Sequence, residues 1–168
     1  MAGASGWGKG KEGGPGLGGF AARSCAGVAC CRSPRSVGLR QMAPLAAIPD
    51  VTFVSLQKGE AAGQACPPEM TLLDFTDELT DFEDTAALVA ALDLVISVDT
   101  AVVHLAGGLG VPVWVLNRFD TCWRWLLGRS DSLWYRSVTL FRQPAPGDWD
   151  RVMQEAAAAL GGIHGQAV

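Results

Sequence analysis

Residues 94–116 read LVISVDTAVVHLAGGLGVPVWVL, and this stretch decides the fold class. Residues 94–98 are apolar almost throughout, which is typical of a parallel strand buried on both faces. Apolar residues at helical spacing then predict a helix over 101–109, which Gly110 ends. Residues 111–116 form a second apolar strand. Strand, helix and strand in this order predict a right-handed crossover between parallel strands.

The same alternation continues on both sides of this stretch. In chain order, the further elements that the sequence predicts are a helix over 39–48, a strand over 51–56, a short helix over 59–65, a strand over 72–75, a helix over 81–92, an aromatic-rich loop over 117–136, a strand over 138–141 and a helix over 149–160. Strands that alternate with short helices imply a parallel sheet covered by helices on both faces. We therefore expect an α/β protein with a Rossmann-like sheet.

The N-terminal segment differs from the rest of the chain. Residues 1–36 contain ten glycines and no hydrophobic periodicity, so we expect a disordered leader. The expected Rossmann-like domain then covers residues 37–161, and residues 162–168 form a tail. Residues 1–40 carry six basic residues and one acidic residue, which leaves open a basic arm that binds nucleic acid. We expect nucleic-acid binding to be the weaker alternative, because the basic residues form no continuous run.

Composition and motifs exclude several classes of protein. The chain has 168 residues, of which 49% are hydrophobic and 18% charged, so it is long enough for one domain with a core. We expect no membrane span, because no apolar run approaches the necessary length. Five cysteines without metal-ligand spacing indicate neither a disulfide framework nor a metal site, and favour the cytoplasm. The motifs of dinucleotide oxidoreductases, P-loop nucleotidases and α/β-hydrolases are missing.

The strongest candidate for a binding site follows residues 94–98. The expected strand delivers Asp99 and Thr100 to the start of a helix, whose first amides lack intrahelical partners and favour an anion. Ala101 is small enough for the backbone to approach a phosphate, and His104 lies one turn on along the same face. Asp99 as a simple N-cap and His104 as a core side chain remain open alternatives.

A resemblance to a known family extends over residues 35–160. The run DFTDELTDFEDTAALVAALDLVISVDTAVVHLAGGLGVPVWVL, followed by WRWLLGRSDSLWY and LFRQPAPGDW, resembles the C-terminal end of bacterial tetratricopeptide-repeat proteins that carry a glycosyltransferase domain. That domain is similar to the ADP-heptose:lipopolysaccharide heptosyltransferases of glycosyltransferase family 9, and distantly to O-GlcNAc transferase. Upstream of Arg35 the resemblance stops.

The resemblance implies the C-terminal half of a GT-B fold, which binds the nucleotide-sugar donor. The positions that would bind an ADP-linked donor are Asp99, Thr100, Ala101 and His104 at the diphosphate, Gln57 and Glu60 at the ribose, and Thr80, Asp81 and Phe82 at the base. It implies no cofactor and no metal, and it assigns no catalytic residue, because the base usually comes from the N-terminal acceptor domain.

Three departures from this family bear on activity. The turn that usually precedes residues 37–45 is missing, the first strand of the nucleotide domain is expected to be missing or replaced, and the acceptor domain and repeats are absent. We therefore expect an N-terminally truncated, incomplete domain that is inactive alone. The alternative is a non-catalytic remnant that self-associates through exposed apolar surface.

Aromatic and charged residues near the strand ends have two interpretations. The indoles at positions 114, 123, 125, 134 and 149 favour packing and loop anchoring over ligand stacking. Arg118 or Arg124 could pair with a phosphate, although an acidic surface partner is the commoner explanation. The acidic stretch over 74–84 is expected to be solvated rather than a metal site.

Overall fold

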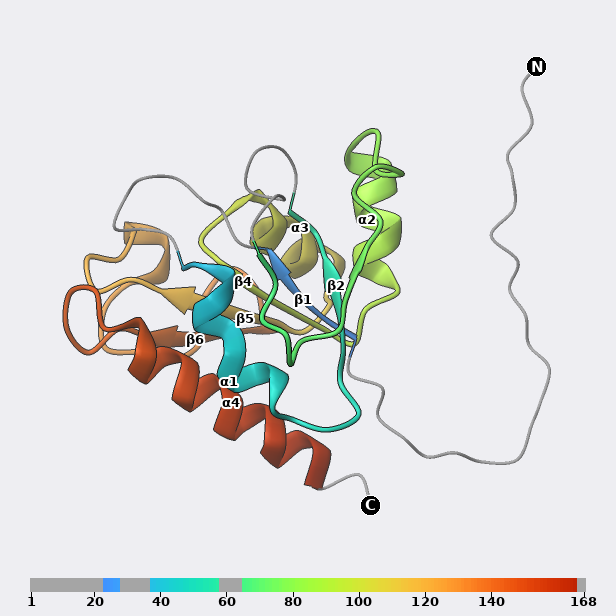
Figure 1. Cartoon of the computed structure of the whole chain (residues 1–168). Helices are drawn as coiled ribbons and strands as arrows, with labels where there is room; N and C mark the ends of the chain where they lie inside the picture. The colour runs from blue at the N-terminus through green and yellow to red at the C-terminus, as the bar shows by residue number, and fades with distance from the viewer. Residues whose placement is uncertain (1–22, 28–36, 58–64, 166–168) are drawn as a thin grey trace.

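The computed structural model describes residues 23–27, 37–57 and 65–165, and within them the chain forms one mixed α/β domain (Figure 1). The described strands are β1 (Arg23–Gly27), β2 (Thr52–Ser55), β3 (Leu72–Asp74), β4 (Leu94–Val98), β5 (Val113–Asn117) and β6 (Val138–Arg142). They form a six-stranded sheet in the order β3-β2-β1-β4-β5-β6, and every described pairing between these strands is parallel. This is the strand order of the doubly wound Rossmann fold. The expected fold class is confirmed.

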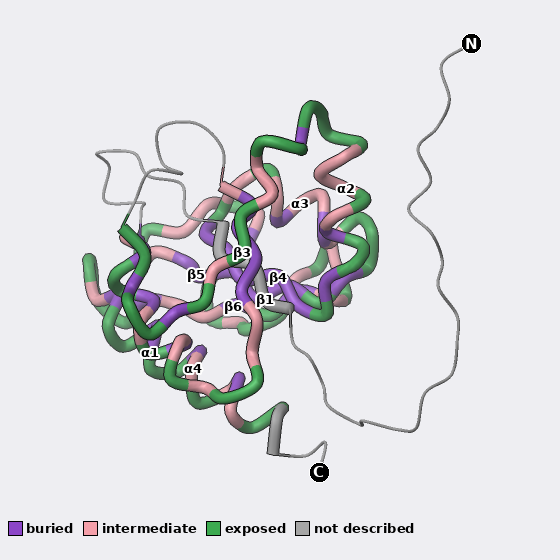
Figure 2. The backbone as a smooth tube through the Cα atoms, turned by 45° about the vertical axis from the view of Figure 1, so that its right-hand side comes forward, coloured by how far each residue is buried: buried purple, intermediate pink, exposed green. Residues whose placement is uncertain are grey.

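Helices cover both faces of the sheet. The described helices are η1 (Leu39–Met42), α1 (Ala43–Ala46), α2 (Phe82–Ala90), α3 (Ala101–Leu109), η3 (Trp123–Trp125) and α4 (Trp149–Gly165). In Figure 1, α1 and α4 lie together on one side of the sheet, and α2 and α3 lie on the other. The sheet is therefore the middle layer of three, and its strands β4 and β5 are buried on both faces (Figure 2).

Each face of the sheet has its own apolar core. Alternate residues of one strand enter different cores because successive side chains point to opposite faces. In β4, Ile96 packs in the core beneath α1 and α4, whereas Val95 packs in the core beneath α2 and α3. Trp114 and Trp149 lie in the first core and Trp125 lies in the second. The packing interpretation of these three indoles is confirmed.

The centre of the sheet corrects one expectation. The sequence predicted no strand before residue 37 and a missing first strand in the nucleotide domain. The structure instead places Arg23–Gly27 as β1 between β2 and β4, in register with four residues of β4 and two of β2. A short strand without apolar alternation escapes a search for periodicity, because its place depends on two neighbouring strands that are distant in sequence. The rest of residues 1–36 lies outside the described residues, as does the short helix expected over 59–65.

Local signals set several helix boundaries. Asp81 caps α2, because its carboxylate accepts hydrogen bonds from the amides of Glu83 and Asp84 at 2.8 and 3.0 Å. Gly110 ends α3 with φ 76°, a left-handed conformation that glycine adopts without steric cost. The remaining predicted strands and helices lie within a few residues of their observed positions. The helix expected over 39–48 is divided into η1 and α1.

Candidate functional site

The candidate site lies at the carboxyl end of β4, where the strand order of the sheet reverses. β4 neighbours β1 on one side and β5 on the other, and the chain leaves β4 directly into the start of α3. Open α/β sheets bind ligands at such a switch point, outside the carboxyl ends of the strands. The presence of β1 therefore makes the topology of the site that of a complete Rossmann domain.

The start of α3 is open to an anion in a way that the start of α2 is not. Thr100 is the N-cap residue of α3, but its side chain makes no capping hydrogen bond. Its hydroxyl lies 3.2 Å from the hydroxyl of Ser97 instead. At α2, by contrast, the Asp81 carboxylate occupies the equivalent amides. An uncapped helix start keeps its partial positive charge and its amide donors for a ligand.

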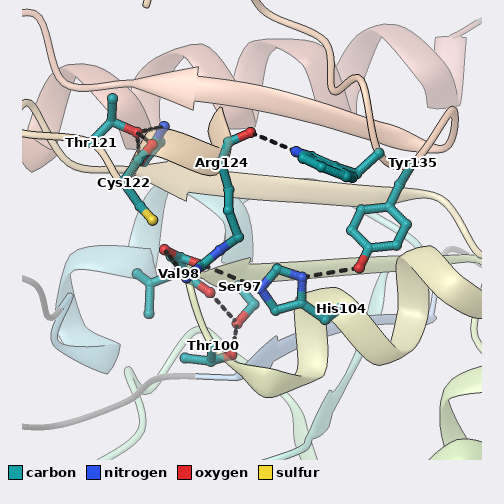
Figure 3. A network of polar contacts seen from close by, with 11 residues as sticks. Ser97, Val98, Thr100, His104, Thr121, Cys122, Arg124 and Tyr135 are labelled. Carbon is teal, nitrogen blue, oxygen red and sulfur yellow. Dashed lines mark hydrogen bonds and ion pairs between the residues drawn. The ribbon is translucent and has the colours of Figure 1, made fainter. Parts of the chain in front are cut away.

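Three polar side chains gather beside this helix start (Figure 3). Asp99 lies 3.7 Å from His104, between Oδ1 and Nε2, and 3.8 Å from Arg124, between Oδ2 and Nη2. Their side chains are 28%, 32% and 39% exposed, so the cluster is half-buried and accessible. Both separations exceed hydrogen-bond length, so these contacts leave the donors of His104 and Arg124 able to bind another group. The N-cap of α3 is Thr100, so the alternative that Asp99 is a simple N-cap is wrong.

Arg124 has a further unused donor. Its Nε is buried and has no hydrogen-bond partner among the described residues. The guanidinium also lies over the ring of Trp123, 5.7 Å from the centroid. A buried donor without a partner is costly, and a ligand oxygen or an ordered water would remove that cost. The sequence offered Arg118 or Arg124 as a partner for a phosphate, and of the two it is Arg124 that lies beside Asp99.

Aromatic side chains hold the imidazole of His104. The Trp125 ring stacks against it, with a centroid separation of 5.6 Å and an interplanar angle of 11°. The Tyr135 hydroxyl lies 3.2 Å from Nδ1 on the ring. His104 is therefore not a simple core side chain, because it is half-buried with both ring nitrogens facing polar groups. Sequence reasoning missed Tyr135, which is 31 residues away in the chain.

Hydrogen bonds from β6 fix the loop that carries Arg124 and Trp125. Arg142 donates from Nε to the carbonyl of Arg129 at 2.7 Å and from Nη2 to the carbonyl of Trp125. Partial burial lowers the pKa of the Arg142 guanidinium. Gln143, which is buried, accepts a hydrogen bond from the amide of Phe119 through its side-chain oxygen. The loop is thus attached to the sheet on both sides of the site residues.

The residues expected at the ribose and the base are at other strand ends. Gln57 follows β2, and its amide donates to the Ser55 hydroxyl at 3.3 Å. Glu60 lies outside the described residues. Thr80 donates from its amide and its hydroxyl to the carboxylate of Asp84, at 2.8 and 2.6 Å. Phe82 is 65% exposed, so it is not a core contact beneath α2.

Other predicted groups have structural partners or lie at the surface. Arg118 contacts Asp120 at 3.4 Å, the acidic surface partner that its alternative interpretation required. Trp123 and Trp134 are exposed and meet edge to face, with centroids 6.1 Å apart. The Trp134 indole nitrogen also donates a hydrogen bond to the carbonyl of Arg124 at 3.2 Å, so Trp134 fits the loop-anchor interpretation, although neither indole is buried in a core. In the described part of the chain, no cluster of His, Cys, Asp and Glu could hold a metal ion. No helix among these residues has the length and apolar character needed to cross a membrane.

Comparisons with known proteins add two similarities. No family model matches the chain. Over 123 residues the chain is 35% identical to Protein FlbA of Caulobacter vibrioides, a match that covers 70% of this chain and 20% of that protein. The E. coli heptosyltransferase WaaC with ADP-2-deoxy-2-fluoro heptose is similar at 17% identity and a TM-score of 0.49, over 88% of this chain and 44% of that chain. The chain therefore spans about a fifth of the curated relative it matches.

Proposed function

We propose that this domain binds the diphosphate of a nucleotide-sugar and is the donor half of a glycosyltransferase of the heptosyltransferase-like class. The observation that carries the proposal is the uncapped start of α3 at the switch point, with donors of His104 and Arg124 beside it. The family resemblance of residues 35–160 supports the same substrate class. An ADP-linked donor remains the expected choice.

The charges around the helix start suit a diphosphate. A phosphate oxygen at the amides of Ala101 and Val102 would meet the positive end of the helix dipole. Arg124 would move from its loose contact with Asp99 and donate to a second oxygen in the charge-assisted geometry that guanidinium groups favour. Asp99 would then keep the cation and the imidazole near the site without consuming their donors.

The same groups would assist departure of the diphosphate during sugar transfer. Negative charge develops on the leaving oxygen, and fixed amides with a guanidinium stabilise it. In this proposal His104 and Arg124 act on the donor alone. The general base and the acceptor surface would come from an additional domain, so we expect little or no transferase activity from the 168-residue chain.

Calorimetric titration of the full chain with ADP, UDP and GDP tests this proposal. We expect saturable ADP binding that Arg124→Gln weakens about 10-fold or more, because a charge-assisted hydrogen bond contributes about 1.5–3 kcal/mol. Arg151→Gln is the matched control, since it removes an equal charge from α4, where Arg151 pairs with Glu155 at 2.8 Å. Absence of binding by all three nucleotides, in a sample with a cooperative thermal transition, would contradict the proposal.

A second candidate function is self-association through the loop after β5. Within this loop four large apolar side chains, Trp123, Leu127, Leu133 and Trp134, are each at least 60% exposed. Apolar side chains at this exposure favour contact with another surface. Light scattering over a hundredfold range of concentration tests this candidate: a constant monomer mass would exclude it.

A further inference from the structure

His104 is held from three directions, and each ring nitrogen faces a different partner. The Tyr135 hydroxyl lies 3.2 Å from Nδ1, at hydrogen-bond distance. The Asp99 carboxylate lies 3.7 Å from Nε2. Trp125 stacks nearly parallel to the ring, at 11°, which restricts the ring plane. The orientation of the imidazole is therefore fixed by Asp99 at the end of β4 and by Trp125 and Tyr135 in the loop after β5; Figure 3 shows the contact with Tyr135.

The chemistry of these partners selects one tautomer. A neutral imidazole has one nitrogen that donates and one that accepts. A carboxylate only accepts, whereas a phenol hydroxyl can donate or accept, so the carboxylate is the neighbour that discriminates between the tautomers. The arrangement that suits both neighbours has the proton on Nε2, facing Asp99, and the lone pair on Nδ1, accepting from Tyr135. The opposite tautomer would point the Nε2 lone pair at the carboxylate.

We propose that Tyr135 is a positioning residue that, together with the carboxylate of Asp99, fixes His104 as the Nε2–H tautomer, so that the site presents Nε2–H as a hydrogen-bond donor. Because Asp99 is too distant to consume this donor, Nε2–H remains able to bind a ligand oxygen. The tautomer follows from the contacts alone. Its role as a donor to a diphosphate rests on the proposed function.

A glycine in α3 makes the Tyr135 contact possible. A Cβ on Gly107 would lie 2.7 Å from Cγ and 2.9 Å from Cδ1 of Tyr135, closer than side chains tolerate. The ring can therefore lie against the helix one turn after His104 only because position 107 lacks a side chain. The next glycine, Gly108, has nothing within 4 Å of the equivalent position. The two neighbouring glycines provide a matched pair of variants.

Nitrogen NMR of the full ¹⁵N-labelled chain measures the tautomer directly. The sequence has two histidines, so a His164→Gln variant assigns the signals. Near pH 8 we expect the Nε2–H pattern for His104 in the unmodified chain. Tyr135→Phe keeps the ring and removes the hydroxyl, and it should give a mixture of both tautomers.

The glycine variants separate this role from a general effect on packing. Gly107→Ala should disturb the tautomer as Tyr135→Phe does, whereas Gly108→Ala should leave it unchanged. An Nδ1–H pattern in the unmodified chain, or an unchanged Nε2–H pattern in folded Tyr135→Phe, would overturn the proposal.

Nucleotide binding tests the donor role separately from the tautomer. If the proposed function holds, Tyr135→Phe should weaken ADP binding about 5-fold, and Gly108→Ala should not weaken it. Full ADP affinity in Tyr135→Phe, together with a mixed tautomer, would refute the donor role alone. Failure of the unmodified chain to bind any nucleotide, with the Nε2–H pattern intact, would refute the proposed function and leave the tautomer assignment standing.

Discussion

Deleting residues 1–27 removes β1, whereas deleting residues 1–22 leaves the strand intact. The two truncations differ only by the five residues Arg23–Gly27. Because β1 lies between β2 and β4, its loss divides the sheet into two parts. We expect the shorter deletion to keep the Tm of the full chain and the longer one to lower it sharply.

The register of β1 gives the size of the effect. β1 pairs with four residues of β4 and two of β2. With about 1 kcal/mol of net stability for each backbone hydrogen bond, one bond per paired position amounts to about 6 kcal/mol. The total stability of a small domain is about 5–15 kcal/mol.

Circular dichroism and differential scanning calorimetry measure the outcome. A loss of about 6 kcal/mol corresponds to a fall in Tm of about 12–24 °C for a domain of this size. Ala26→Pro in the full chain is a milder test, since proline removes one donor from the strand. If both truncations melt cooperatively within about 3 °C of each other, a difference of about 1 kcal/mol, β1 does not hold the sheet together and the reasoning is wrong.

Three smaller perturbations test local features by chemical denaturation. Asp81→Ala should lower the free energy of unfolding by about 1 kcal/mol, because it removes the carboxylate that caps α2. Thr100→Ala should lower it by less than about 0.5 kcal/mol, because the Thr100 side chain makes no capping hydrogen bond at α3. Equal losses would contradict this assignment of the two helix caps. Arg142→Met should lower stability by about 2 kcal/mol through two lost hydrogen bonds, and an unchanged midpoint would refute that anchoring role. Hydrogen bonds from the hydroxyl and the amide of Thr76 lower the pKa of Asp74, so the contribution of Asp74 to the free energy of unfolding is present above about pH 4 and is lost as the pH falls further. Thr76→Val should reduce this loss of stability in acid. A difference in stability between Thr76→Val and the unmodified chain that grows as the pH falls would have the wrong sign.

The candidate site was predictable only in part. Asp99, Thr100 and His104 follow a buried strand within a few residues, so the sequence alone predicts that they lie at the carboxyl edge of the sheet. Arg124 and Tyr135 come from the loop after β5, and no local pattern indicates which of their atoms face the site. That decision depends on how the loop packs against α3, where Gly107 leaves room for the tyrosine ring.

The sequence by itself determined the parts of this protein whose signals are local. Apolar runs, helical spacing and turn residues indicate β4, α3 and β5, because the pattern that signals each of them lies within a few consecutive residues. Only the tertiary structure decided that Arg23–Gly27 is the central strand and that Arg124 lies beside Asp99. Both depend on pairings between distant segments. The short strand β1 acquires its place from the edges of β2 and β4, because backbone N–H and C=O groups within a sheet require hydrogen-bond partners whatever side chains accompany them.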